Sequence, residues 1–202
     1  VNLGFHSIGA AIGNDTVDAM LDEGKGINVI APTWFSMIDN EGNIRSFGGT
    51  AYVEKAHKRA VRVWGVVDNF NYELETGKPV DDLEVLSHTQ KRRKLVDGIV
   101  TQARKLGLDG INVDFEGLSS DCGIHYVQFL RELSVECRAY GLAFSVDNYV
   151  PFHFNDYYRL DIQGEIADYV IIMGYDEHWH GSKEPGSVAS IDYVSYGIDK
   201  TL

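Results

Sequence analysis

The stretch Asp109-Gly110-Ile111-Asn112-Val113-Asp114-Phe115-Glu116 decides the fold of this chain. Side chains alternate between the two faces of a β-strand, so every second residue of the stretch shares a face. The polar face carries Asn112, Asp114 and Glu116, and the apolar face carries Ile111, Val113 and Phe115. Unpaired buried carboxylates cost several kcal/mol, so the polar set must face a cavity and the apolar set must pack beneath covering elements. We interpret the stretch as a catalytic strand.

The two acids at the end of this strand are close enough to affect each other's ionisation. Residues two apart on a strand lie roughly 6–7 Å apart, so Asp114 and Glu116 can divide into an acid and an anion. An exposed strand with scattered acids is the alternative interpretation of the same pattern.

Composition and charge limit the class of protein. A chain of 202 residues with 44% hydrophobic content predicts a sizeable core and, most simply, one domain. The net charge of −12 argues against a nucleic-acid partner. No run of about 18 apolar residues predicts a membrane span, and the first residues do not resemble a signal peptide, although one can be removed before the chain as given. The basic run 91–94 predicts a solvated helix face, and Cys122 and Cys137 have no metal-type spacing.

Short apolar runs alternate with helical stretches, which predicts βαβ units and a parallel sheet. The expected strands cover residues 1–5, 28–31, 61–67, 110–115, 142–146 and 169–173. Apolar residues at three- and four-residue spacing predict helices that end at Gly107 and Gly141, where a positive φ stops a helix. A further helix is expected in the tail, from Val188 to Ile198.

Polar and aromatic residues follow the carboxyl ends of five of these strands, the end where βα barrels and open α/β sheets place their sites. The clusters lie at residues 32–35, 68–72, 116, 147–149 and 175–179. Aromatic rings among amides and acids suit a sugar, which has an apolar face and a hydroxyl rim. Each ring taken alone also fits a place in the core, but five clusters at one end favour a carbohydrate cleft.

Two motifs resemble glycoside hydrolase family 18, the chitinase-like (β/α)8 barrels. Residues 109–116 are similar to the family's D-x-x-D-x-D-x-E strand, with Asn112 where the pattern has an acid. Met173-Gly174-Tyr175-Asp176 is similar to its M-x-Y-D motif on the sixth strand. The resemblance is strongest to bacterial spore-cortex and cell-wall N-acetylglucosaminidases, through residues 29–35, 63–70, 145–151 and 174–179.

The resemblance implies a role for each residue of the two motifs. Glu116 is the general acid and later the base, Asp114 holds the acetamido N–H and stabilises an oxazolinium ion, and Tyr175 hydrogen-bonds the acetamido carbonyl. Asn112 holds Asp114 in place without a second charge, and Asp176 binds a sugar hydroxyl or supports the acetamido end of the site.

Further substrate contacts are expected from the strand-end clusters. The expected contact residues are Trp34, Asn69, Asn148, Tyr149 and Trp179. Asp109 precedes the alternation, so we expect a turn or supporting role for it. Neither a metal nor an organic cofactor is implied, although Glu177, His178 and His180 offer an alternative interpretation as metal ligands.

The implied function is a retaining glycosidase that cleaves β-1,4 bonds after N-acetylglucosamine in peptidoglycan of the spore cortex or cell wall. The nucleophile is then the substrate's own acetamido oxygen. Two alternatives are a chitinase or endo-β-N-acetylglucosaminidase acting on chitin or glycans, and an amino-sugar-binding barrel without catalysis. The expected partner is an N-acetylglucosamine-containing polysaccharide, and the expected location is extracellular, in the cell wall or on the spore of a bacterium.

The length of the chain predicts an incomplete barrel. A (β/α)8 barrel usually needs about 250 residues, and the pattern predicts six strand–helix units. We therefore expect residues 1–202 to be a family 18 catalytic domain without strands seven and eight. No residue matches the tryptophan that the family carries on its last strand. Unpaired edges on the first and sixth strands predict a dimer or larger assembly and weak or absent hydrolysis.

Overall fold

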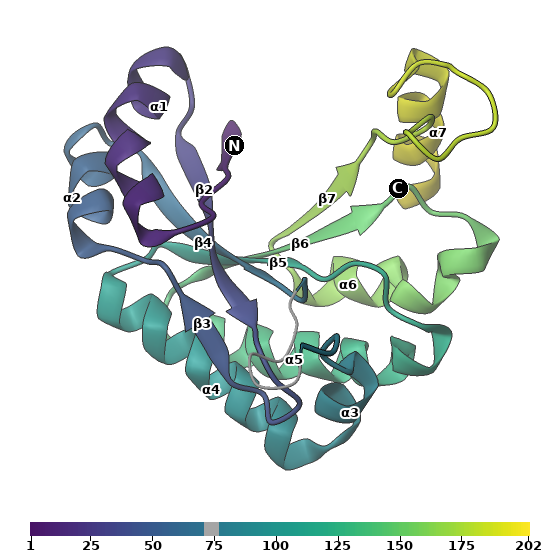
Figure 1. Ribbon diagram of the computed structural model, residues 1–202, viewed down its shortest axis with the longest axis horizontal. Helices are drawn as coiled ribbons and strands as arrows, with labels where there is room; N and C mark the ends of the chain where they lie inside the picture. The colour runs from purple at the N-terminus through teal and green to yellow at the C-terminus, as the bar shows by residue number, and fades with distance from the viewer. Residues whose placement is uncertain (71–76) are drawn as a thin grey trace.

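The computed structural model describes residues 1–70 and 77–202, and it shows a curved sheet with helices along one side (Figure 1). The strand order is β1-β2-β4-β5-β6-β7, and these six strands are parallel. A further strand, β3, pairs antiparallel with β2. The strands are β1 (Leu3–His6), β2 (Val29–Met37), β3 (Ile44–Ser46), β4 (Arg62–Asp68), β5 (Gly110–Asp114), β6 (Ala143–Tyr149) and β7 (Tyr169–Met173).

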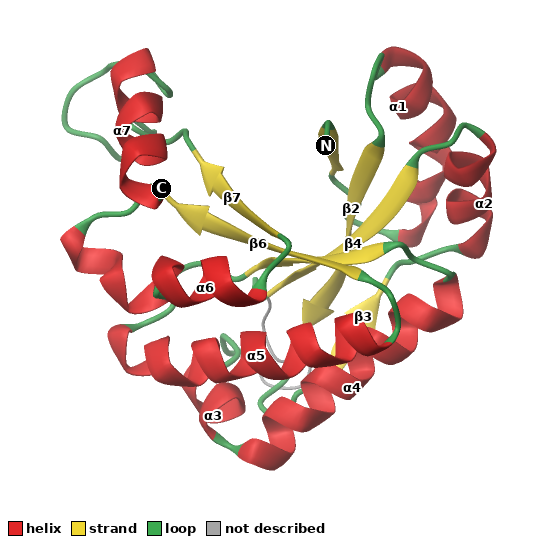
Figure 2. Ribbon diagram, turned by 180° about the vertical axis from the view of Figure 1, so that it is seen from behind, coloured by secondary structure: helices red, strands yellow, loops and turns green. Residues whose placement is uncertain are grey.

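Helices alternate with the parallel strands and pack on the outer side of the sheet, as the view from behind also shows (Figure 2). The α-helices are α1 (Val17–Glu23), α2 (Thr50–Lys58), α3 (Asp82–Ser87), α4 (Thr89–Leu106), α5 (Gly123–Ala139), α6 (Leu160–Ile166) and α7 (Ile191–Thr201). Short 3-10 helices are η1 (Ala11–Thr16), η2 (Ser120–Cys122) and η3 (His153–Tyr158). Among the described helices, none combines enough length with enough apolar character to pass through a lipid bilayer.

The predicted α/β class with a parallel sheet is confirmed, and all six predicted strands form. The sheet of the described residues is curled and open, with β1 and β7 at its two ends, rather than a closed barrel. The prediction of 169–173 matches β7, whereas β2 runs on to Met37 and the short strand β3 was not predicted. Gly107 and Gly141 adopt positive φ values of 74° and 69° at the ends of α4 and α5, as predicted.

The apolar face of β5 packs against helices, as its alternation predicts. Ile111 and Val113 are fully buried, and the Phe115 ring stacks on Phe129 of α5 with the ring centroids 5.3 Å apart. The basic run at the start of α4 is not wholly solvated, because Arg92 is buried. Its guanidinium donates to the Glu132 carboxylate and to a backbone carbonyl, which satisfies the buried charge.

Side-chain oxygens at the amino ends of alternate strands fix the register of the sheet. Asp109 Oδ2 accepts from the Val63 backbone N–H at 2.7 Å, and Asp168 Oδ2 accepts from the Phe144 N–H at 2.9 Å. Each acid immediately precedes a strand and caps the first residues of the strand beside it. Asp109 also contacts His57 Nε2 at 2.8 Å, so the predicted supporting role fits its position.

Candidate active site

The polar face of β5 lies on the side of the sheet opposite its helix-packed face, and Glu116 follows the end of the strand. Asn112 is fully buried, whereas Asp114 and Glu116 are partly exposed. The order of burial follows the strand from the middle of the sheet toward its carboxyl end. The alternation predicted from sequence therefore brings these three side chains to one place.

The side chain of Asn69, in the segment after β4, holds the backbone of Glu116. Asn69 Nδ2 donates to the Glu116 carbonyl at 2.8 Å, and Asn69 Oδ1 accepts from the Glu116 N–H at 2.9 Å. The same Nδ2 lies 3.2 Å from each carboxylate oxygen of Asp82, the first residue of α3. Burial raises the pKa of Asp82 to about 6. Asn69 was predicted as a substrate contact, and the structure gives its amide these intramolecular partners.

Tyr149, at the end of β6, contacts the same turn from the other side. Its hydroxyl accepts from the Gly117 N–H at 3.0 Å. Burial raises the pKa of Tyr149, and so does its hydrogen bond to the Glu116 carboxylate. The carboxylate of Glu116 is thus fixed by a phenol while its peptide is fixed by an amide. Asn71 and Tyr72, from the same predicted cluster as Asn69, lie outside the described residues.

Asp114 is a carboxyl with a strongly disfavoured charge. Burial raises the pKa of Asp114 to about 7, and the nearby charges of Glu116 and Asp68 add to the effect. Asp68 is the residue paired with Asp114 across β4 and β5, and burial raises the pKa of Asp68 as well. Among the described residues, Asp114 Oδ1 is buried without a hydrogen-bond partner. These acids form one coupled group at the carboxyl ends of neighbouring strands.

Asn112 connects this group to β6 rather than to Asp114. Its Nδ2 donates to Ser145 Oγ at 3.0 Å and to Asp147 Oδ1 at 2.9 Å. Within the described part of the chain, Asn112 Oδ1 has no hydrogen-bond partner. The prediction that Asn112 holds Asp114 is therefore wrong, because both amide protons point to β6. Burial raises the pKa of Asp147 to about 7 against the opposing hydrogen bond from Asn112.

The segment after β7 supplies the second predicted motif. Tyr175 is 50% exposed, and partial burial with the charges of Asp114 and Glu116 raises its pKa to about 12. The charges of these two acids therefore act on the Tyr175 phenol. Asp176 is exposed and adopts a positive φ of 63°, and Trp179 is 57% exposed.

The three residues with an alternative interpretation as metal ligands lie in this segment too. The Glu177 carboxylate accepts from Ser190 N at 2.7 Å and from Ser190 Oγ at 3.0 Å, which ties the loop to the start of α7. His178 Nδ1 lies 2.9 Å from the Ser187 carbonyl, and the Trp179 and His180 rings meet edge to face. Across residues 1–70 and 77–202, no group of three possible metal ligands is assembled.

Two predicted substrate contacts face the helices instead of the acids. Trp34 is fully buried, its ring meets Tyr52 of α2, and its Nε1 donates to Asn14 Oδ1 at 2.7 Å. Asn148 is 1% exposed, and its side-chain amide exchanges two hydrogen bonds with Gln163 of α6. The structure places neither side chain with the acids. Asn148 points away from its neighbours Asp147 and Tyr149, as strand alternation requires, whereas Trp34 lies at a register irregularity of β2 between Thr33 and Phe35.

Asp68 and Asp147 fall in the predicted strand-end clusters, but sequence reasoning named neither acid as a site residue. The same alternation could have found Asp147, because it shares the face of Ser145 and Tyr149 on β6. For Asp68 the signal was its position at the end of a buried strand beside the strand of Asp114.

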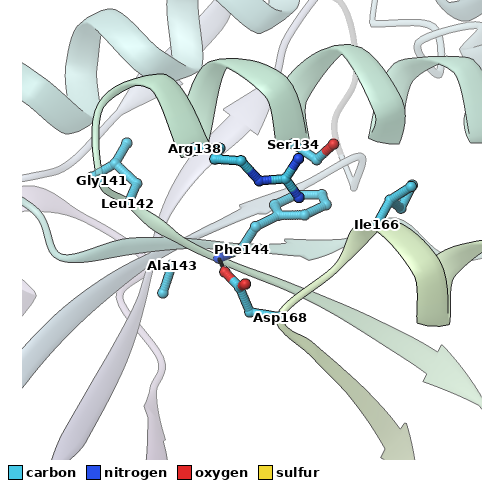
Figure 3. Close-up of a pocket in the computed structure, with 8 residues that line it drawn as sticks. All are labelled: Ser134, Arg138, Gly141, Leu142, Ala143, Phe144, Ile166 and Asp168. Atoms are coloured by element: carbon cyan, nitrogen blue, oxygen red, sulfur yellow. Dashed lines mark hydrogen bonds between the residues drawn. The ribbon is translucent and has the colours of Figure 1, made fainter.

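A separate cavity of about 320 Å³ lies at the amino ends of β6 and β7 (Figure 3). Its lining includes Arg138 of α5 and Asp168. Because this is the opposite end of the strands from Asp114, the cavity takes no part in the group of acids.

Comparisons with known proteins identify the family of the chain. Residues 77–202 match the model of glycosyl hydrolases family 18. The chain is 29% identical over 182 residues to the uncharacterized glycosylase YvbX of Bacillus subtilis (strain 168), covering 85% of this chain and 51% of that protein. It is 30% identical over 121 residues to the cortical fragment-lytic enzyme of Bacillus anthracis, covering 54% of this chain and 27% of that protein.

Solved structures share the fold. A chitinase from Chromobacterium violaceum ATCC 12472 superposes with a TM-score of 0.81 at 23% identity, over 100% of this chain and 63% of that one. The chain thus spans about half the length of YvbX and less than two thirds of this structure. The family model covers more than half of the chain and includes β5 with Asp114 and the following residue Glu116. The chain belongs to glycosyl hydrolases family 18.

Proposed function

We propose that this protein is a retaining glycosidase that cleaves β-1,4 bonds after N-acetylglucosamine in peptidoglycan. The observation that carries the proposal is the grouping of Glu116, Asp114 and Tyr175 at the carboxyl ends of β5 and β7, where their charges influence one another. A general acid, an anion for a positive intermediate and a phenol donor are the groups that substrate-assisted hydrolysis needs.

In this mechanism Glu116 donates its proton to the glycosidic oxygen as the bond breaks. The acetamido oxygen of the substrate attacks the anomeric carbon, so the protein needs no carboxylate nucleophile. Asp114 accepts a hydrogen bond from the acetamido N–H and balances the positive oxazolinium ion. Tyr175 donates a hydrogen bond to the acetamido carbonyl. In the second step Glu116 removes a proton from the water that attacks the anomeric carbon and opens the oxazolinium ring.

The structure supports a precise position for the general acid. Asn69 and Tyr149 hold the backbone and the carboxylate of Glu116 from two sides. A fixed acid near the bond it protonates raises the rate because little reorientation remains on the way to the transition state. Trp179 and Asp176 are exposed beside Tyr175, and we propose that they contact neighbouring sugar rings or hydroxyls.

The name of the Bacillus anthracis relative, a cortical fragment-lytic enzyme, favours peptidoglycan as the substrate. It also favours a cell-wall or spore-associated location outside the cytoplasm. Likeness in fold to a chitinase makes chitin the second candidate. We also propose that residues 1–202 belong to one catalytic domain whose six parallel strands form part of a (β/α)8 barrel.

Product analysis tests the proposed substrate. Purified peptidoglycan and an N-acetylglucosamine oligomer are incubated with the protein, and new reducing ends are identified by mass spectrometry. The proposal predicts N-acetylglucosamine reducing ends from peptidoglycan. N-acetylmuramic acid ends would overturn it, and turnover of the oligomer without any attack on peptidoglycan would replace peptidoglycan with chitin.

The open edges of the sheet lead to a proposal about assembly. β1 and β7 end the strand order of the described residues, and unpaired strand edges favour association. We propose that the 202-residue chain forms a dimer or larger species through these edges. Light scattering of the purified chain tests this, and a monodisperse monomer would contradict it.

A further inference from the structure

Asp147 is a deeply buried acid to which the mechanism above assigns no role. It is 3% exposed on β6 and accepts a hydrogen bond from Asn112 Nδ2. The parallel register pairs Val113 with Val146. The next residues on the two strands, Asp114 and Asp147, are therefore neighbours on the face that carries the proposed chemistry.

Two neighbouring buried carboxyls cannot both ionise without a large electrostatic cost. Among the described residues, no lysine or arginine contributes to the pKa shift of Asp114 or Asp147 and so offsets that cost. The titratable groups that act on the two carboxyls from the surrounding elements are all acids or phenols. They are Asp68 on β4, Glu116 after β5, Tyr149 on β6, Tyr175 after β7 and Tyr126 on α5.

Burial distinguishes the two carboxyls. Asp147 is almost fully enclosed, whereas Asp114 lies at the partly exposed end of its strand. The charged form is therefore more costly at Asp147, even with one hydrogen bond from Asn112. Asn112, the buried residue of β5 beside Asp147, is neutral, so the second buried acid of this group lies on β6.

We propose that Asp147 is a positioning residue that keeps its proton after Asp114 has lost its own, so that Asp114 is the anion of the pair in the working enzyme. This rests on the proposed function of Asp114. Asn112 orients the neutral carboxyl by the hydrogen bond described above. When the pH rises and Asp147 also loses its proton, the two carboxylates repel each other, and Asp114 is displaced from the position in which it balances the oxazolinium ion.

The test compares Asp147→Asn with the wild type in the pH profile of kcat/KM. Asparagine has the shape of the neutral acid but cannot ionise. We expect the variant to keep turnover within about threefold of the wild type at slightly acidic pH, and its alkaline limb to move up by about one pH unit or more. The matched control is Ser145→Ala, which removes the other partner of Asn112 without removing a titratable group and should keep the wild-type profile.

Two results would overturn the proposal. One is an Asp147→Asn profile that superimposes on that of the wild type. The other is a loss of more than about 100-fold at every pH in a folded variant, which would mean that an anion is needed at this position.

A second readout separates this proposal from the proposed function. Carbon-13 NMR of labelled aspartate carboxyls, with the Asp147 signal assigned by its absence in Asp147→Asn, follows protonation without substrate. A midpoint near neutrality supports the protonated Asp147, and a midpoint near ~4, the ordinary value for aspartate, overturns it. A neutral midpoint in a protein that cleaves none of the test glycans refutes the proposed function alone.

Discussion

One aspartate precedes strand β5 and another is its last residue, and the two have different hydrogen-bond partners. Asp109, before the strand, accepts hydrogen bonds from the Val63 backbone and from His57. Asp114, at the other end, has a buried oxygen without a partner among the described residues, and its pKa is raised to about 7. A carboxylate with hydrogen-bond partners stabilises the fold. A carboxyl that lacks such partners and lies among other acids is a candidate for contact with a ligand. The partners around an aspartate, rather than its place in a motif, separate structure from chemistry.

Exchanging each aspartate for asparagine should give the largest difference in activity between the two ends of β5. We expect Asp114→Asn to lower kcat by about 10³-fold, because the neutral amide cannot balance the charge of the intermediate. Asp109→Asn is the matched control and should leave kcat within about threefold, since it lies at the other end of the strand. Steady-state kinetics with circular dichroism to confirm folding measures both. Equal losses in the two variants would contradict the division of roles.

Removal of the Asn69 amide, which holds the backbone of Glu116, should have a smaller effect on turnover. In Asn69→Ala the peptide of Glu116 loses both of its side-chain hydrogen bonds. We expect kcat to fall about 10- to 100-fold with KM nearly unchanged, because a misplaced acid slows the chemistry more than it weakens binding. A large rise in KM at unchanged kcat would instead return Asn69 to the substrate-contact role predicted from sequence.

The amino-end aspartate should affect stability. Asp109→Ala leaves the Val63 N–H without its carboxylate partner, and we expect the free energy of unfolding to fall by about 1–3 kcal/mol. Urea denaturation measures this, with Asp121→Ala as the control at an exposed acid. If Asp121→Ala proves as destabilising as Asp109→Ala, the capping interaction does not contribute to the fold.

The carboxyl-end aspartate should affect stability in the opposite sense. With a pKa of about 7 against an ordinary 3.8, folded Asp114 binds protons more tightly than the unfolded chain does. Its contribution to the free energy of unfolding therefore falls as pH rises from about 4 to about 7 and then levels off. Asp114 is partly exposed, so solvent screens its charge and reduces the effect. We expect the free energy of unfolding of Asp114→Asn, relative to that of the wild type, to be about 1 kcal/mol higher at pH 8 than at pH 4. Thermal melts across this range that run parallel for the two proteins would refute the raised pKa.

Much of the fold could be predicted because strand alternation is local. The stretch 109–116 predicts which residues pack on helices, and the structure places Ile111, Val113 and Phe115 there. The short strand β3 could not be predicted, since three residues of antiparallel pairing leave little periodic signal. The burial of Arg92 depends on Glu132, forty residues away, which no local pattern indicates.

The candidate site was predicted less completely because clusters were taken whole. Asp147, Asn148 and Tyr149 follow one another, yet only the first and last face the acids. Trp34 was expected among sugars and lies against Tyr52. The link from Asn112 to Asp147 depends on the register of two strands more than thirty residues apart, and a single sequence does not specify that register.

The exchange Glu116→Gln tests the central claim most directly. The amide keeps the size of the side chain but cannot donate the proton that the leaving oxygen needs. We predict that the wild type releases N-acetylglucosamine reducing ends from peptidoglycan, and that the variant releases none while it still binds the substrate in calorimetric titration. Near-normal rates in the folded variant would contradict the assignment of Glu116 as the general acid.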